Sequence, residues 1–333
     1  MKAWSRAING LLALLGIVVS LLVVEVVLRW IGYTYTPLRI QTIETWSEWR
    51  YFHAFQDGHF EYDPYLIWRP RKSVPPFNAH GYRGGEISLR KKPAEIRIFA
   101  IGDSNTLGWL GNGDFNWPES LQNILKQENP RFSVINAGVY GYSSFQGLRR
   151  LEEALPFEPD MVLVSFGTND AMRVTVSDAA FLSRGIRALH LDEVLVRWRI
   201  GQTLLATYDR FASRQEKGLV PRVSIQEYRD NLMQMIALGK SKGIHVILLT
   251  RPFTGDSPDE RWWKNFAPMY NATVLEVAKE AGIPVIDVYA YFAGKPKYFS
   301  DESHFTEAGH RSMARLIYER IRPLLLRRGQ SGG

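Results

Sequence analysis

The longest apolar stretch of the chain lies near its N-terminus, at residues 8–31, and reads INGLLALLGIVVSLLVVEVVLRWI. A helix of about 20 apolar residues spans the hydrocarbon core of a bilayer. Trp4 on one side and Trp30 and Tyr33 on the other are placed like the aromatic residues that flank membrane spans. The pattern predicts an N-terminal transmembrane helix over residues 8–31 that anchors the chain in a lipid bilayer.

Glu25 places a charge inside this apolar stretch, and Arg29 follows it four residues later on the same helix face. An i,i+4 ion pair near the interface would partly neutralise the carboxylate. Contact with a partner helix is the alternative, because charges within membrane spans generally have a partner. A membrane protein partner therefore stays open as a second hypothesis for Glu25.

The flanks of the apolar stretch predict its orientation. The stretch is longer than the apolar region of a signal peptide, and no small-x-small cleavage pattern follows it, so we expect an uncleaved single-pass anchor. Lys2 and Arg6 precede it, which predicts a cytoplasmic N-terminus at residues 1–7 by the positive-inside tendency. The main domain is then expected outside the cytoplasm, in the periplasm if the source is bacterial.

Residues 32–93 are predicted to form a connecting region that is rich in proline and aromatic residues. Apolar and aromatic side chains recur at roughly helical spacing from Ile43 to Phe52, which predicts a short amphipathic helix. Aromatic stripes of this kind usually pack into a core. Contact with the bilayer surface is the alternative.

Beyond residue 94, short apolar runs alternate with amphipathic stretches. The strand-like runs lie at residues 95–102, 132–138, 161–167, 245–250 and 284–289. The helix-like stretches lie at residues 118–127, 145–155, 224–243, 271–282 and 306–325. This alternation predicts an α/β fold in which helices cover both faces of a five-stranded parallel sheet. We expect this domain over residues 94–328, followed by a flexible tail at residues 329–333.

An insertion interrupts the alternation at about residues 172–222, between the third strand-like run and its following helix. Residues 192–215 within it read DEVLVRWRIGQTLLATYDRFASRQ, which is a helix-like pattern. We expect this helical insertion to cap the mouth of an active site, since loops that move over active sites commonly act as lids. A membrane-facing or partner-binding surface is the alternative.

Charge and cysteine content exclude several classes of protein. The net charge is +7, but Lys and Arg are scattered and form no basic run interleaved with aromatic residues, so no nucleic-acid partner is expected. Attraction to acidic lipid headgroups accounts for the charge more simply. The chain has no cysteine, which removes disulfides, zinc–thiolate sites and thiol catalysis. We expect neither a metal nor another cofactor.

Candidate chemistry lies in the loops after the strand-like runs, where parallel sheets carry their sites. Ser104 in GDSN follows the first run directly, although a serine in such a turn also fits a helix cap. Near the C-terminus, DESH places Asp301 three residues before His304. A serine hydroxyl needs a base such as His304 to become a nucleophile. The histidine needs an acceptor at its other ring nitrogen, which Asp301 can supply.

An acyl-transfer site also needs hydrogen-bond donors for an oxyanion. Gly141 follows the second run in NAGVYGYS, and Asn169 follows the third in GTND. We expect the N–H groups of Ser104 and Gly141 and the side-chain amide of Asn169 to converge on one oxyanion hole. Gly138 is the rival glycine because it lies nearer to the strand end, but the glycine two residues before Ser143 favours Gly141.

Three other polar residues near these motifs have structural interpretations. Asp103 and Asp170 are of a type that more often fixes loop backbones than reacts. His310 falls six residues after His304, inside a helix-like stretch, and is expected to be structural.

The motifs GDSN, Gly141, GTND and DESH, in this order, resemble the blocks of the SGNH (GDSL-type) hydrolase superfamily over residues 95–326. The residues that match the family's blocks are Ser104, Gly141, Asn169, His304 and Asp301. The resemblance implies a flavodoxin-like, three-layer α/β/α sandwich and a Ser-His-Asp triad. Phe305 departs from the family, in which a proline often follows the histidine. Residues 78–86 resemble a segment of some membrane-anchored members, in which Arg83 either binds an anionic group or is a buried structural arginine.

Three functions fit these residues. The first is a serine esterase that hydrolyses an acyl ester through an acyl-Ser104 intermediate, with O-acetyl groups on a glycan as a candidate substrate. The second is an O-acyltransferase that uses the same triad and passes the acyl group to an extracytoplasmic glycan when water is excluded. The third is a non-catalytic subunit of a membrane protein complex, because a fold and its activity can separate.

Overall fold

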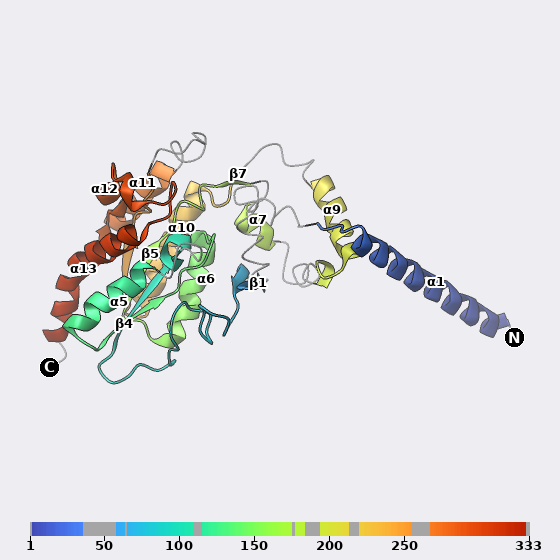
Figure 1. Ribbon diagram of the computed structural model, residues 1–333, viewed down its shortest axis with the longest axis horizontal. Helices are drawn as coiled ribbons and strands as arrows, with labels where there is room; N and C mark the ends of the chain where they lie inside the picture. The colour runs from blue at the N-terminus through green and yellow to red at the C-terminus, as the bar shows by residue number, and fades with distance from the viewer. Residues whose placement is uncertain are drawn as a thin grey trace.

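The computed structural model describes residues 2–35, 58–63, 65–108, 115–174, 177–183, 194–212, 220–254 and 267–330. A long N-terminal helix, α1 (Lys2–Trp30), extends away from a sandwich of strands and helices (Figure 1). The helix predicted between residues 43 and 52 lies outside the described residues.

A five-stranded parallel sheet forms the centre of the sandwich, and the predicted fold class is confirmed. Its strands are β3 (Ile96–Gly102), β4 (Phe132–Asn136), β5 (Met161–Ser165), β8 (His245–Leu249) and β9 (Val285–Ile286). They lie in the order β4-β3-β5-β8-β9, and every neighbouring pair is parallel. The chain thus leaves β3 toward one edge and then crosses to the other side, which creates a topological switch point where such folds bind ligands.

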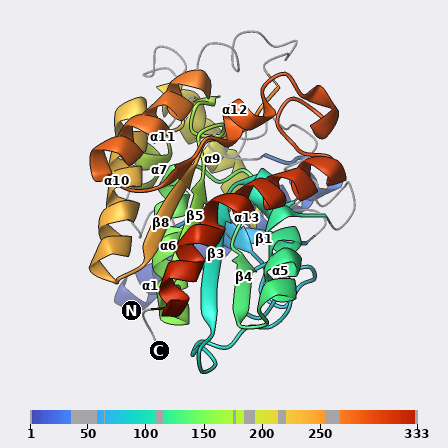
Figure 2. The same ribbon diagram turned by 90° about the vertical axis from the view of Figure 1, so that its left-hand side faces the viewer.

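Helices cover both faces of the sheet, as Figure 2 shows. One layer contains α6 (Ser144–Ala154), α10 (Ile225–Ser241) and α11 (Ala267–Ala281). The other contains α5 (Trp117–Glu128), α12 (Val288–Phe292) and α13 (Glu307–Gln330). Along β3, Phe99 and Ile101 pack into the first layer, whereas Ile98 and Ala100 pack into the second. Because both faces are buried, the strands are apolar along nearly their whole length.

The described part of the connecting region packs onto the first layer. β1 (Phe60–Asp63) and β2 (Ile67–Pro70) form an antiparallel pair. The Trp68 indole N–H donates to the Tyr140 carbonyl over 2.9 Å, and the Tyr142 hydroxyl donates to the Trp68 carbonyl over 2.7 Å. The chain from residue 58 therefore contributes to the core instead of serving only as a connection.

The insertion begins and ends on a short antiparallel pair, β6 (Arg173–Val174) with β7 (Val220–Pro221). Between them the structure describes α7 (Asp178–Ser183) and α9 (Arg199–Ala212). α9 lies against the end of α1 and apart from the sheet (Figure 1), so α9 does not form the cap expected at the mouth of the site. The remaining short elements are α4 (Ser104–Leu107) and the 3-10 turns Leu155–Phe157 and Pro296–Tyr298.

Gly147 provides a test of this packing. A Cβ at this position of α6 would lie 2.3 Å from the ring of Phe166. Alanine ordinarily favours a helix over glycine by about 1 kcal/mol, but overpacking costs about 1–3 kcal/mol. We therefore expect Gly147→Ala to lower the urea midpoint of unfolding. Gly85→Ala, which meets no atom within 4 Å, is the matched control and should leave the midpoint unchanged or slightly raised.

Candidate active site

Ser104 is the first residue of α4 and directly follows the turn at the end of β3. The Asp103 carboxylate caps this short helix and accepts the N–H of Asn105 over 2.9 Å. A Cβ on Gly102 would lie 2.2 Å from the Thr106 hydroxyl oxygen. The turn therefore needs glycine at this position, and Asp103 has the backbone-fixing position expected from the sequence.

The structure brings Ser104, His304 and Asp301 into one hydrogen-bonded chain. Ser104 Oγ lies 2.8 Å from His304 Nε2, and His304 Nδ1 lies 2.8 Å from Asp301 Oδ2. Asp301 Oδ1 also accepts the backbone N–H groups of Ser303 and His304 over 2.9 and 2.8 Å. These bonds fix the carboxylate relative to the loop that carries the histidine. The order of groups is the one required for a nucleophile, its base and the acceptor that orients the base.

The Asp301 carboxylate is held in its ionised form. Burial on its own would raise its pKa, but the hydrogen bond and charge of the His304 ring, with the N–H donors of Ser303 and His304, outweigh burial. The pKa of Asp301 therefore lies below its usual range. An ionised carboxylate at this position can stabilise positive charge on the imidazole.

The loops after β4 and β5 meet beside Ser104. β3 pairs with both strands, and the Val139 N–H donates to the Gly102 carbonyl over 3.0 Å. The Asn169 side-chain amide donates to the Tyr142 carbonyl over 2.9 Å, which ties Asn169 to the residue after Gly141. Within the described ranges, the N–H groups of Ser104 and Gly141 have no hydrogen-bond acceptor. They are available to a ligand.

The two glycines of the loop after β4 have different roles. Gly141 has a φ of 70°, a left-handed conformation that favours glycine. A Cβ on Gly138 would lie 2.3 Å from the backbone nitrogen of Leu107. Gly138 is therefore required for close packing against α4, whereas Gly141 shapes the turn that carries the available N–H.

Arg251, which the sequence analysis did not identify, joins the serine turn to the histidine loop. It follows β8 and is only 2% exposed. Its Nε donates to Asp103 Oδ2 over 2.7 Å, and its Nη1 donates to the Ser303 carbonyl over 2.9 Å. Its position directly after the strand-like run 245–250 could have identified it, because site residues were expected in the loops that follow these runs.

Arg222 supports the loop that carries Gly141 in a similar way. It is 1% exposed and lies beside β7 at the end of the insertion. Its Nη1 donates to the Gly141 carbonyl over 2.7 Å, and its Nη2 donates to Asp178 Oδ2 over 2.9 Å. The Ser143 hydroxyl donates to the same carboxylate oxygen over 2.6 Å. The ends of the insertion therefore contribute directly to the site, which its sequence pattern did not reveal.

The remaining polar residues have structural surroundings. Asp170 is fully buried and accepts the N–H groups of Ser144 and Gly167 over 2.8 and 3.0 Å. Burial raises the pKa of Asp170 to about 7, although these donors favour the ionised form. Burial, followed by the charges of His304, Arg83 and Arg251, lowers the pKa of His310 to about 3, so His310 is neutral.

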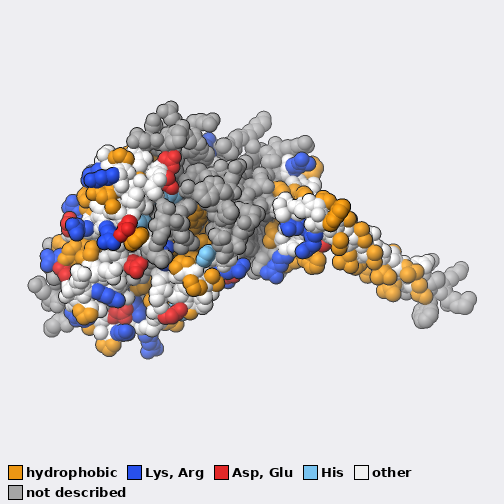
Figure 3. All heavy atoms as spheres, in the orientation of Figure 1, with side chains coloured by type: hydrophobic (Ala, Val, Ile, Leu, Met, Phe, Trp, Pro, Cys, Tyr) orange, Lys and Arg blue, Asp and Glu red, His pale blue; other side chains and the backbone are white. Residues whose placement is uncertain are grey.

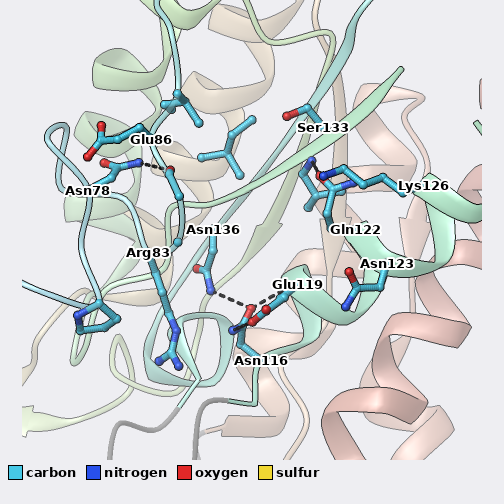
Figure 4. Close-up of a pocket in the computed structure, with 16 residues that line it drawn as sticks. Asn78, Arg83, Glu86, Asn116, Glu119, Gln122, Asn123, Lys126, Ser133 and Asn136 are labelled. Carbon is cyan, nitrogen blue, oxygen red and sulfur yellow. Dashed lines mark hydrogen bonds between the residues drawn. The ribbon is translucent and has the colours of Figure 1, made fainter. Parts of the chain in front are cut away.

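A cavity of about 580 Å³ with a mixed polar and apolar lining lies between the segment around Arg83, helix α5 and strand β4 (Figure 4). Its lining side chains include Asn78, Arg83, Glu86, Asn116, Glu119 and Asn123. Arg83 is 8% exposed and donates from Nη1 to the Gly108 carbonyl over 2.9 Å, so it has the position of a buried arginine. Asn136 joins the cavity to α4 by donating to the Thr106 carbonyl over 3.0 Å.

No group of three or more His, Cys, Asp or Glu side chains within the described ranges is arranged to hold a metal ion.

Comparisons with known proteins match the part of the chain that carries this site. The model of the GDSL-like lipase/acylhydrolase family matches residues 100–312. An uncharacterized lipoprotein of Bacillus subtilis is 25% identical over 266 residues, which cover 67% of this chain and 87% of that protein. The thioesterase 1/protease 1/lysophospholipase L1 of Escherichia coli is 26% identical over 185 residues, which cover 51% and 84%. A crystal structure of a lipase/acylhydrolase from Enterococcus faecalis, 23% identical, covers 68% of this chain and 95% of its own, with a TM-score of 0.46.

The raised pKa of Asp170 predicts a pH-dependent loss of stability. Between the unfolded value of 3.8 and the folded value of about 7, the folded chain keeps a proton that the unfolded chain has lost. Stability is then fully present below pH 3.8 and decreases as the pH rises through 7, by up to about 4 kcal/mol.

Asp170→Asn removes this titration and also leaves one N–H without an acceptor. At about pH 5 the free energy of unfolding should be lower for the variant than for the wild type. This gap between the two free energies should narrow by roughly 2–3 kcal/mol toward pH 8. Urea unfolding measures the gap at each pH, with the exposed Glu152→Gln as control. A gap that is constant across this range would mean that Asp170 is ionised throughout.

Proposed function

Because the chain belongs to the GDSL-like lipase/acylhydrolase family, we propose that it is a serine esterase in which Ser104, His304 and Asp301 form the catalytic triad. The observation that carries the proposal is the hydrogen-bonded chain from Ser104 Oγ through the His304 ring to Asp301, with both bonds to the ring at 2.8 Å. A serine without this chain would be only the first residue of a short helix.

The reaction proceeds in two steps that use the same base. Ser104 Oγ attacks the ester carbonyl carbon while His304 Nε2 takes the hydroxyl proton, and Asp301 stabilises the imidazolium. His304 then passes this proton to the leaving alkoxide oxygen, which departs as an alcohol and leaves acyl-Ser104. A water molecule attacks the acyl-enzyme with His304 again as base. The acid leaves, and the proton returns to Ser104.

The oxyanion of each tetrahedral intermediate is bound by three donors in this proposal. They are the backbone N–H groups of Ser104 and Gly141 and the side-chain amide of Asn169. Two observations support the assignment: both N–H groups are free of acceptors within the described residues, and Asn169 is hydrogen-bonded to the Gly141 loop. Donors that are already oriented stabilise the developing charge without reorganisation.

The substrate class that we favour is an acyl ester of a glycan, with acetyl esters as the simplest case. The cavity between the segment around Arg83, α5 and β4 is linked to α4 through Asn136. Its lining combines amide, guanidinium and carboxylate groups with apolar side chains such as Ile87 and Val134, a mixture that suits the rings and hydroxyl groups of a sugar (Figure 4). Ser104 and His304 are each only 4% exposed. Limited access of water favours, as a second candidate, transfer of the acyl group from Ser104 to a sugar hydroxyl.

We further propose that α1 is a single-pass anchor with a cytoplasmic N-terminus and an extracytoplasmic domain. An 18-residue window within Ile8–Trp30 has a mean hydropathy of 3.0, and only 6% of that window is buried within the protein, unlike a core helix. A cleaved signal would remove Glu25, which accepts the N–H of Ile200 in α9 over 3.0 Å. This contact supports a helix that is retained.

A fluorophosphonate probe tests the nucleophile. The wild-type chain should be labelled at Ser104, and Ser104→Ala should abolish labelling while its melting temperature stays near that of the wild type. Absence of labelling in the folded wild-type chain would contradict the esterase proposal and leave the non-catalytic subunit as the remaining hypothesis.

Incubation with p-nitrophenyl acetate and an unacetylated oligosaccharide distinguishes ester hydrolysis from acyl transfer. Free acetate alone would exclude the transferase.

Asn169 allows a separate test of the oxyanion hole. Asn169→Ala should lower kcat by about 10²–10³-fold with little change in KM, because the lost donor acts mainly on the transition state. Gln127→Ala, at an exposed position of α5 outside the lining of the cavity, is the control and should retain kcat. If Asn169→Ala keeps the wild-type melting temperature and its kcat is within twofold of the control, Asn169 is not a donor of the oxyanion hole.

A further inference from the structure

Helix α9 carries an exposed apolar stripe that nothing in the proposed chemistry uses. Leu204, Tyr208 and Phe211 are 57%, 51% and 65% exposed. Their spacing of four and three residues places them on one face of the helix. Thr203 is also exposed and lies on the adjacent face. An amphipathic helix whose apolar face is open needs an apolar partner.

The same helix is fixed to α1 by polar contacts. Glu25 is only 4% exposed and accepts the N–H of Ile200, at the N-terminus of α9, over 3.0 Å. A carboxylate is favoured at a helix N-terminus, where the dipole presents positive charge. Arg29 pairs with the other oxygen of Glu25 over 2.7 Å, as the sequence predicted. The Tyr35 N–H donates to the Gln202 side chain over 3.0 Å. The helix that partners Glu25 therefore belongs to the same chain.

The point of attachment gives the depth of α9 relative to α1. Glu25 lies five residues before Trp30, which is about 7.5 Å along a helix. Trp30 and Ile31 are 86% and 60% exposed and mark the end of the span. Helices that lie in a membrane interface bury their apolar face by about 5–10 Å. The attachment of α9 therefore falls at the depth of an interfacial helix.

The apolar surface is also continuous from one helix to the other. The side chains of α1 are exposed along most of its length, and Figure 3 shows hydrophobic side chains continuing from α1 into the region of α9. Arg197 and Arg210 are exposed at opposite ends of the α9 segment, and Arg29 is 56% exposed. Guanidinium groups beside an apolar stripe suit the phosphate level of a bilayer.

We propose that α9 is an interfacial helix that lies on the outer surface of the bilayer next to α1, with the lipid as its partner. Leu204, Tyr208 and Phe211 enter the boundary between headgroups and acyl chains, and the arginines contact lipid phosphates. The proposal rests on the anchor proposed above and goes beyond it. A single helix only tethers the domain, whereas a second helix in the interface also restricts its rotation relative to the membrane.

Because the full chain contains no cysteine, single-cysteine variants can report the surroundings of each position. The variants L204C, F211C and T203C are labelled with an environment-sensitive fluorophore and reconstituted in vesicles of phosphatidylethanolamine and phosphatidylglycerol. V19C reports the span, and K242C reports the sandwich. Each label is then quenched in separate samples by aqueous iodide and by spin labels on the lipid chains near the headgroups.

Labels at positions 204 and 211 should lose more fluorescence to the lipid-borne quencher than to iodide, with the reverse at 203 and 242. If iodide quenches the labels at 204 and 211 as strongly as the label at 203, with position 19 protected, the interfacial helix is overturned and the anchor stays intact. Iodide access at position 19 would overturn the anchor and the inference together. Protection of 204 and 211 from both quenchers would replace the lipid with a protein partner and also overturn the proposal.

Discussion

Strand β3 hydrogen-bonds to β4 on one side and to β5 on the other, and the candidate site depends on this placement. Parallel strands present their carboxyl ends at one edge, so the turns after these three strands must be neighbours. Ser104, Gly141 and Asn169 each lie in one of those turns. The turn carrying Ser104 also requires glycine at position 102, where a Cβ would lie 2.8 Å from the Ser165 carbonyl of β5. The close contact between β3 and β5 thus shapes the backbone that carries Ser104.

Two buried ion pairs hold the loops that the sheet brings together. Arg251 and Asp103 join the serine turn to the histidine loop, and Arg222 and Asp178 hold the Gly141 loop to the insertion. Removing one partner of such a pair costs about 3–5 kcal/mol, because the other charge stays buried without compensation. Each guanidinium also donates to a backbone carbonyl, Arg251 to that of Ser303 and Arg222 to that of Gly141. The two pairs therefore hold these loops rigidly. A proposed site for acyl transfer needs this rigidity, since its donors stabilise the oxyanion only when they are already oriented.

The N-terminal end of the chain, for which a membrane anchor is proposed, follows the same physical rule. Glu25 is costly in an apolar span, and its cost is offset by Arg29 on its own helix and by the N-terminal N–H groups of α9. The charge that would be unfavourable in a lipid is thereby the attachment point of a second helix. The insertion consequently contacts two parts of the chain: its ends support the Gly141 loop through Arg222 and Asp178, while α9 packs against α1.

Local pattern was sufficient to predict the five strands, the covering helices and the residues that follow the strand ends, because strands buried on both faces are continuously apolar and amphipathic helices repeat every 3.6 residues. The same patterns located the candidate site residues along the chain, which are Ser104, Gly141, Asn169, Asp301 and His304. Their catalytic roles are a proposal. Arg251, Arg222 and Asp178 were not found, the packing of β1 and β2 into the core was not expected, and α9 was assigned to a cap. Each of these features depends on which distant segment a side chain contacts. A buried ion pair between residues 148 positions apart, or a carboxylate at the end of another helix, produces no periodic pattern in the sequence. Only the tertiary structure decided those contacts.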